Sequence, residues 1–127
     1  MSKKILVTDK APRAIGPYSQ GVRAGGFFFF SGQIPLDPAS GQLKGRDITE
    51  QTELVMENIG GLLEAAGLDF GDVVKSTIYL TDLSSFATVN EIYGRRFPAD
   101  PPARSTVEVK SLPKGAAVEI EVVALCR

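Results

Sequence analysis

The chain has 127 residues, a length that suits one domain around one hydrophobic core and leaves no room for two. Its net charge of −1 and isoelectric point near 5.4 argue against nucleic acid or an anionic membrane as the main partner, because both favour a clustered basic surface. It contains no histidine, so any chemistry it performs lacks the commonest general base.

The number of cysteines and the hydropathy of the chain indicate where in the cell the protein is expected. The single cysteine, Cys126, can form neither an internal disulfide nor a cysteine zinc site, and no imidazole is present to bind a metal. The opening residues 1–10 hold too few apolar residues for a signal peptide, and no later run approaches membrane-spanning length. We therefore expect a cytoplasmic protein that binds no membrane, no nucleic acid and no metal.

The first predicted element is a β-hairpin within residues 20–38. A turn at 24–26 (Ala-Gly-Gly) separates a short strand around Val22 from a strand over 27–34, which begins with four phenylalanines. Because four consecutive apolar residues cannot alternate with polar ones, we expect both faces of that strand to be covered.

Two helices and a strand follow. Residues 47–67 show helical periodicity, with Asp47 and Glu50 arranged as a capping box and Gly67 just past the end. The pair Gly60-Gly61 inside this helix predicts a close approach to the sheet. Residues 72–83 read as a strand. Residues 84–97 read as a second helix, opened by a serine cap and closed by Arg95-Arg96 and Pro98.

The last two predicted strands, 104–112 and 116–125, are joined by Pro-Lys-Gly, which predicts a hairpin. The order β-β-α-β-α-β-β predicts an α+β sandwich of one sheet with two helices on one face. The other face would then expose alternate residues of several apolar strands, so we expect neighbouring subunits to cover it in a closed ring.

Arg104 and Glu119 are the residues best suited to chemistry. In the predicted hairpin they would lie near each other. The forked donors of an arginine match the two oxygens of a carboxylate, and a glutamate can carry protons. The alternative is a cross-strand ion pair worth about 1 kcal/mol or less. Tyr18, Ser31 and Asn90 would by default be a packing residue, a strand-end hydroxyl and a solvent-facing helix residue.

The chain resembles the reactive-intermediate deaminases of the RidA (YjgF-type) family over nearly its whole length. Four blocks carry the resemblance, in the family's order: AIGPYSQGV at 14–22, SGQIPLDPASG at 31–41, residues 55–97, and PARSTVEVKSLPKGAAVEIE at 102–121. The resemblance implies one domain over residues 1–127, with a chorismate-mutase-like α+β fold. It also implies a homotrimer whose sheets form a central barrel-like core, with sites in the clefts between subunits.

The resemblance further implies hydrolysis of enamines and imines such as 2-aminoacrylate to 2-oxo acids and ammonia, without a cofactor. By position, Arg104 matches the arginine that binds the substrate carboxylate, and Glu119 matches the glutamate that positions or activates water. Tyr18, Ser31 and Asn90 match other substrate-binding positions. Many members have cysteine where this chain has Thr106, which keeps a hydrogen-bonding group in the site but removes the thiolate.

Two other functions remain open. One is a deaminase of a larger substrate, such as an aminomuconate-type compound. The other is a regulatory trimer that binds small carboxylates such as 2-oxobutyrate without turnover. Members of the family have also been described as endoribonucleases and translation inhibitors, but the acidic charge and the lack of a basic stripe or a histidine argue against RNA as the natural substrate.

Overall fold

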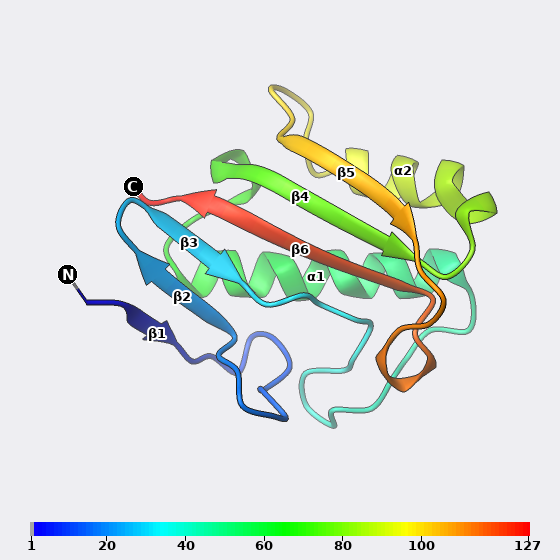
Figure 1. The fold of residues 1–127 in the computed structure, drawn as a ribbon, viewed down its shortest axis with the longest axis horizontal. Helices are drawn as coiled ribbons and strands as arrows, with labels where there is room; N and C mark the ends of the chain where they lie inside the picture. Colours follow the sequence, from blue (N-terminus) through cyan, green and yellow to red (C-terminus); the bar gives the residue numbers. More distant parts are fainter. Residues whose placement is uncertain (1) are drawn as a thin grey trace.

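The computed structural model describes residues 2–127 and shows one open six-stranded sheet in the order β1-β2-β3-β6-β4-β5 (Figure 1). The β4–β5 pair is parallel and every other neighbouring pair is antiparallel. The strands are β1 (Lys4–Leu6), β2 (Gly21–Ala24), β3 (Phe27–Phe30), β4 (Val73–Leu80), β5 (Ala103–Glu108) and β6 (Val118–Leu125).

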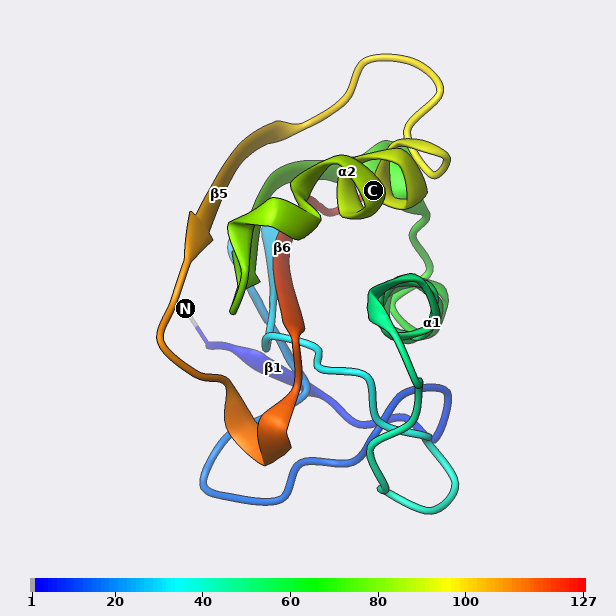
Figure 2. The same cartoon turned by 90° about the vertical axis from the view of Figure 1, so that its right-hand side faces the viewer.

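Two helices, α1 (Ile48–Ala65) and α2 (Phe86–Gly94), lie on the same side of this sheet (Figure 2). Three short 3-10 turns, η1 (Phe70–Asp72), η2 (Leu83–Ser85) and η3 (Pro113–Gly115), connect elements. The predicted α+β arrangement, one sheet with two helices on one face, is confirmed. No helix among residues 2–127 is long and apolar enough to cross a membrane.

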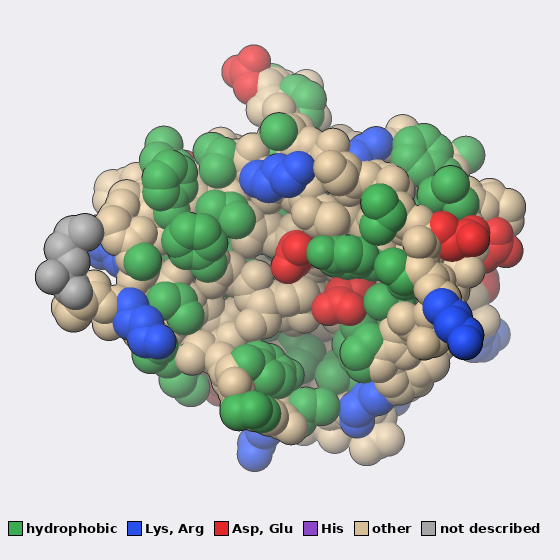
Figure 3. Space-filling model, in the orientation of Figure 1, with side chains coloured by type: hydrophobic (Ala, Val, Ile, Leu, Met, Phe, Trp, Pro, Cys, Tyr) green, Lys and Arg blue, Asp and Glu red, His purple; other side chains and the backbone are tan. Residues whose placement is uncertain are grey.

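The face of the sheet away from the helices is open in the chain. The β2–β3 hairpin forms as predicted, but strand alternation divides its four phenylalanines between the two faces of the sheet. Phe30 is buried under the helices, whereas Phe27 and Phe29 are 41% and 48% exposed, as is Leu125 at 48%. Figure 3 views this open face, where hydrophobic side chains are exposed in several places and acidic side chains lie near the middle.

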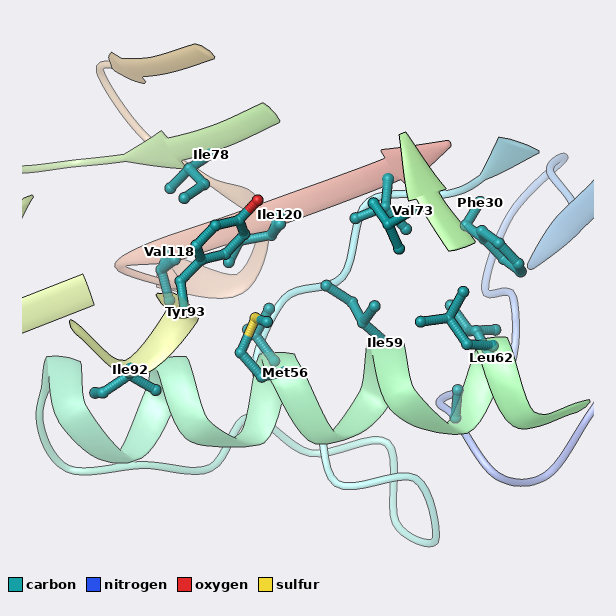
Figure 4. Close-up of a cluster of buried hydrophobic side chains, with 14 of the residues drawn as sticks. Phe30, Met56, Ile59, Leu62, Val73, Ile78, Ile92, Tyr93, Val118 and Ile120 are labelled. Atoms are coloured by element: carbon teal, nitrogen blue, oxygen red, sulfur yellow. The ribbon is translucent and has the colours of Figure 1, made fainter. Parts of the chain in front are cut away.

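The core lies between the sheet and the helices (Figure 4). One stripe of α1 is almost fully buried, and so is the inward-facing set of β6, because both repeat apolar residues at the period of their element. The largest of these side chains are Met56, Ile59, Leu62, Leu63 and Ile120. Glu119 alternates with this inward set on β6, so the core fixes its side chain on the opposite face.

The two ends of α1 show which of the predicted capping interactions form. The Asp47 carboxylate accepts a hydrogen bond from the Glu50 amide at 2.9 Å, and Gly67 adopts a φ of +75° just past the end. Glu50 does not complete a capping box. Its carboxylate instead accepts from the Arg46 backbone at 3.1 Å and pairs with the Arg46 guanidinium at 2.8 Å.

Two further local expectations are wrong. The side chain of Ser85, at the start of α2, makes no capping hydrogen bond, because Asp82 already caps the preceding turn through the Ser84 amide. Gly61 does approach a backbone closely, but the partner is the Lys10 carbonyl, which a Cβ at position 61 would overlap, and not the sheet. The short strand β1, which leads into the segment containing Lys10, was not predicted.

The predicted hairpin of the last two strands is wrong. β6 runs back to the centre of the sheet between β3 and β4, and β5 pairs in parallel with β4 at the edge. The burial pattern explains the choice: β6 alternates buried and partly buried residues along its length, which suits a central strand, whereas β5 has no buried residue and suits an edge. The α2 connection supplies the crossover that a parallel pair requires.

Candidate active site

The six candidate residues fall into two groups on opposite sides of the sheet. Glu119, Ser31 and Tyr18 line one pocket on the open side, with a volume of about 450 Å³. The other three residues lie on the side covered by α2 and do not line that pocket. They are Arg104, Asn90 and Thr106. The structure therefore brings three candidates together in each of two places.

Backbone pairing builds the pocket around Glu119. Residues 31–33 continue the path of β3, and Gln33 exchanges two backbone hydrogen bonds with Ile120, at 2.8 and 3.1 Å. This pairing holds Gly32 directly against Glu119, so closely that a Cβ at position 32 would overlap the carboxylate. A larger residue at position 32 would displace the Glu119 carboxylate from where it lies, so this glycine lets the carboxylate lie against the 31–33 segment.

Two physical effects act on the Glu119 carboxylate. Partial burial raises the pKa of Glu119 by disfavouring the charged form, and the nearby Glu121 carboxylate raises it further. A carboxyl group whose pKa moves upward in a pocket can take up and release a proton closer to neutral pH. Glu119 has the environment of an acid–base group, in a chain without histidine.

The remaining pocket residues are held by local hydrogen bonds. The Ser31 hydroxyl donates to the Ser19 carbonyl at 2.6 Å, and the Tyr18 hydroxyl accepts from the Ile15 amide at 3.2 Å. Tyr18 is half exposed at the pocket mouth. The loop of residues 15–19, the tyrosine loop, thus lines the pocket, and the Tyr18 O–H group can still donate.

Sequence reasoning missed three residues of this region. Gln20 is buried, and its amide nitrogen donates to three carbonyls of residues 8–12, which anchors the segment leading to the tyrosine loop. Arg13 and Glu121 also line the pocket. Strand alternation places Glu121 on the same face as Glu119, so the two-residue spacing could have identified Glu121 as a pocket residue. No comparable signal marked Gln20.

The second group centres on Arg104. Its guanidinium donates to the side-chain amide oxygen of Asn90, Oδ1, at 2.7 Å and lies over the rings of Tyr93 and Phe86, with centroids at 5.1 and 5.5 Å. No carboxylate lies within ion-pair distance of Arg104 in residues 2–127. The aromatic faces and the amide hold the guanidinium in place while leaving donors available for an anion.

Thr106 follows Arg104 on the same face of β5. Its hydroxyl oxygen is buried and has no hydrogen-bond partner within residues 2–127. Leaving a buried hydroxyl without a hydrogen-bond partner costs about 1–3 kcal/mol of stability. Unpaired buried hydroxyls are therefore unusual in native proteins. Arg104 and Thr106 therefore both present unused donors on one side of the molecule.

The expectation that Arg104 and Glu119 lie together is wrong within one chain. It rested on the β5–β6 hairpin, and β4 separates these two strands. Arg104 is in register with Ser76 on β4, whereas Glu119 is in register with Tyr79. The alternative of a cross-strand ion pair between them fails for the same reason. Over residues 2–127, no group of three or more metal-ligating side chains is placed to hold an ion.

Comparison with known proteins agrees with this fold and these blocks. The family described as Endoribonuclease L-PSP matches residues 8–126. Protein DfrA of Myxococcus xanthus is 54% identical, over 98% of this chain and 97% of its own. The 2-iminobutanoate/2-iminopropanoate deaminase of Mus musculus is 47% identical, over 97% of this chain and 91% of its own.

A solved structure shares the architecture. RidA from the Antarctic bacterium Psychrobacter sp. PAMC 21119 has a TM-score of 0.92 at 44% identity, over 96% of this chain and 98% of its own. A match of this extent, in sequence and in structure, covers both groups of candidate residues. The chain belongs to the Endoribonuclease L-PSP family and to its RidA (YjgF-type) deaminase branch.

Proposed function

We propose that this protein hydrolyses reactive enamine and imine intermediates, 2-aminoacrylate and related 2-imino acids, to 2-oxo acids and ammonia. The observation that carries the proposal is the Glu119 carboxylate, partly buried in a pocket with its pKa raised. The deaminase name of the mouse relative, which specifies two small 2-imino acids, supports the substrate class.

The proposed reaction needs positioning and one proton carrier. Arg104 binds the substrate carboxylate through its forked donors, which places the electrophilic imine carbon beside a water molecule at Glu119. The water oxygen bonds to the carbon of the protonated imine, the C=N electron pair moves to the nitrogen, and one water proton passes to Glu119. Glu119 then returns that proton to the nitrogen of the carbinolamine. As the C–N bond breaks, the hydroxyl O–H electron pair forms the carbonyl, the hydroxyl proton passes to Glu119, and ammonia and the 2-oxo acid leave. No cofactor enters this sequence.

We propose further that the site is completed between subunits of a homotrimer. Arg104 and Glu119 face opposite sides of the sheet, so one substrate can meet both only where two copies adjoin. The exposed apolar residues of the open face, including Phe27, Phe29 and Leu125, favour burial against other copies in a central barrel-like core.

Sedimentation equilibrium tests the assembly. We expect a trimer at micromolar concentration, and we expect Phe29→Asp, which places a charge on the apolar face, to shift the protein towards monomer. Glu57→Asp, on the exposed side of α1, is the control and should remain trimeric. A wild-type protein that stays monomeric would contradict the proposal of a shared site.

The activity is tested by coupling a pyridoxal-phosphate-dependent serine or threonine dehydratase to the protein and following 2-oxo acid release against the spontaneous rate. We expect faster release with the wild type and the spontaneous rate with Glu119→Gln. Binding of 2-oxobutyrate without any acceleration would instead support the regulatory trimer. Acceleration confined to an aminomuconate-type substrate would support the larger-substrate deaminase.

RNA cleavage is the less favoured alternative, despite the family description. The pocket contains two carboxylates, Glu119 and Glu121, and one basic residue, Arg13. Such a surface repels a phosphate backbone, which proteins bind mainly through clustered lysine and arginine.

A cytoplasmic location remains a prediction.

A further inference from the structure

Beside Glu119 the pocket contains a second carboxylate, that of Glu121, which the proposed reaction does not use. Both side chains project from β6 on the open face, two residues apart. Two carboxylates this close make a poor arrangement unless one of them has a partner that stabilises its charge. Tyr79 is that partner: its hydroxyl donates to Glu121 Oε1 at 2.7 Å.

The position of Tyr79 is set by the sheet. On β4 it is directly in register with Glu119, and its hydroxyl reaches diagonally along the sheet to Glu121. A donor at 2.7 Å to a carboxylate oxygen is a short hydrogen bond, which fixes where the Glu121 carboxylate lies. The neighbouring carboxylate raises the pKa of Tyr79, so this tyrosine remains protonated and continues to donate at neutral pH.

We propose that Tyr79 and Glu121 are a positioning pair for Glu119, in which Tyr79 holds the Glu121 carboxylate beside Glu119 so that Glu119 is the carboxylate that exchanges the proton. This inference rests on the proposed deaminase function. It assigns the two carboxylates different tasks: Glu121 supplies a fixed negative charge, and Glu119 supplies the movable proton.

Other charged and titratable groups face this pair. Arg13 and Tyr18 line the pocket from the segment that precedes β2, and Lys75 on β4 lines a second, smaller hollow together with Glu121. The Lys75 ammonium donates to Ser105 at 3.3 Å and not to Glu121. In the proposed trimer, Arg104 of a neighbouring copy joins them. Tyr79 is the only side chain within residues 2–127 that hydrogen-bonds Glu121.

The test measures the proton on Glu119 in two ways. The first is the pH dependence of kcat/KM, whose acidic limb reports the free enzyme's essential base. The second is a carbon-13 NMR titration of the Glu119 carboxyl in the intact protein, which needs no turnover. Tyr79→Phe removes only the hydroxyl, and Glu121→Gln removes the charge while keeping the shape.

We expect both readouts to move to lower pH, further in Glu121→Gln than in Tyr79→Phe, because Glu121→Gln removes the negative charge beside Glu119 and Tyr79→Phe frees the Glu121 carboxylate to move away from it. If the acidic limb moves by half a pH unit or more, kcat/KM of Glu121→Gln at a fixed pH on that limb, divided by its own plateau value, should exceed the same ratio for the wild type by about threefold or more. Glu57→Gln removes an exposed carboxylate from α1 and should change neither readout.

Unchanged titration of Glu119 in both variants would overturn the positioning pair, whether or not the protein is a deaminase. Loss of kcat without a change in the pH profile or the titration would also overturn it, because that result indicates a purely structural role. If no imine is hydrolysed at all, the proposed function fails, while the NMR titration still decides whether Tyr79 and Glu121 control the Glu119 proton.

Discussion

The Arg104 guanidinium and the Glu119 carboxylate face opposite sides of one sheet. Arg104 lies over the Tyr93 and Phe86 rings beside α2, and Glu119 lies in the pocket on the open face. β4 stands between their strands, so rotation of the side chains cannot bring both groups to one small substrate. If the two residues act together, they come from different copies of the chain.

Mixed subunits test this directly. Arg104→Ala and Glu119→Gln should each keep at most a few per cent of the wild-type activity alone, about the activity left by a 30-fold loss. When the two variants are unfolded and refolded together, some sites combine the intact Arg104 of one chain with the intact Glu119 of another. Random assortment in a ring makes about a quarter of the sites complete, so we expect about a quarter of the wild-type activity.

The same two variants, refolded separately and then combined, are the control and should stay at that low activity until subunits exchange. A site formed within one chain predicts a different outcome. The co-refolded mixture would then be no more active than the mean of the two single variants, and the proposed sharing would be wrong.

Arg104 itself gives a second prediction. Removing one partner of a partly desolvated, charge-assisted contact costs about 2–5 kcal/mol, so Arg104→Ala should lose roughly 30- to several-thousand-fold in kcat/KM. Arg104→Lys should recover little, because a point charge cannot reproduce the planar fork. Steady-state kinetics with 2-iminopropanoate generated in the assay provides the measurement.

Arg104 also contacts Asn90 and two rings, so its loss could act through folding. Circular dichroism and sedimentation of each variant separate the two effects. A folded, assembled Arg104→Ala protein that hydrolyses imines at nearly the wild-type rate would assign this arginine to the scaffold alone.

The periodic elements were predictable from sequence because each signal is local. Asp47 and Gly67 mark the ends of α1, and alternation on β6 places Glu119 opposite the buried set. Strand pairing was not predictable in the same way. The Pro-Lys-Gly turn after β5 is typical of a hairpin, yet Lys114 and Gly115 adopt positive φ in a 3-10 turn that carries the chain past β4.

That one pairing decides the site. With β6 beside β5, Arg104 and Glu119 would have shared a face or formed an ion pair, and a complete site within one chain would have followed. The observed strand order follows from burial across the whole sheet. β5 has no buried residue and therefore lies at the edge, which leaves the centre to β6. No local pattern in residues 103–125 contains that information.

The adjacent glycines of α1 give a prediction on stability. A Cβ at Gly61 would overlap the Lys10 carbonyl, whereas a Cβ at Gly60 would sit 3.4 Å from Phe70, an ordinary contact. Gly61→Ala should therefore lower the free energy of unfolding by about 1–3 kcal/mol. Gly60→Ala is the matched variant and should be neutral or more stable by up to about 1 kcal/mol, through helix propensity.

Denaturant unfolding at fixed protein concentration measures both changes. Equal effects of the two substitutions would show that helix propensity, and not the close contact with Lys10, decides the stability of this part of α1.

The raised pKa of Glu119 predicts how stability depends on pH. In the pH window between the ordinary glutamate pKa of the unfolded chain and the raised pKa of the folded chain, the folded state binds more protons. The contribution of Glu119 is therefore fully present below this window and is lost as pH rises through the folded pKa. Glu119→Gln cannot ionise and keeps a neutral group in the pocket at every pH.

We accordingly expect the stability of Glu119→Gln relative to wild type to increase as pH rises through that window and then to level off. Denaturant unfolding from pH 4 to pH 8, at one protein concentration, measures the difference. Glu57→Gln, which removes an exposed carboxylate from α1, should instead give a curve parallel to the wild type. A Glu119→Gln difference that is independent of pH would mean that the pocket does not favour the protonated carboxyl, and the acid–base role proposed for Glu119 would lose its physical basis.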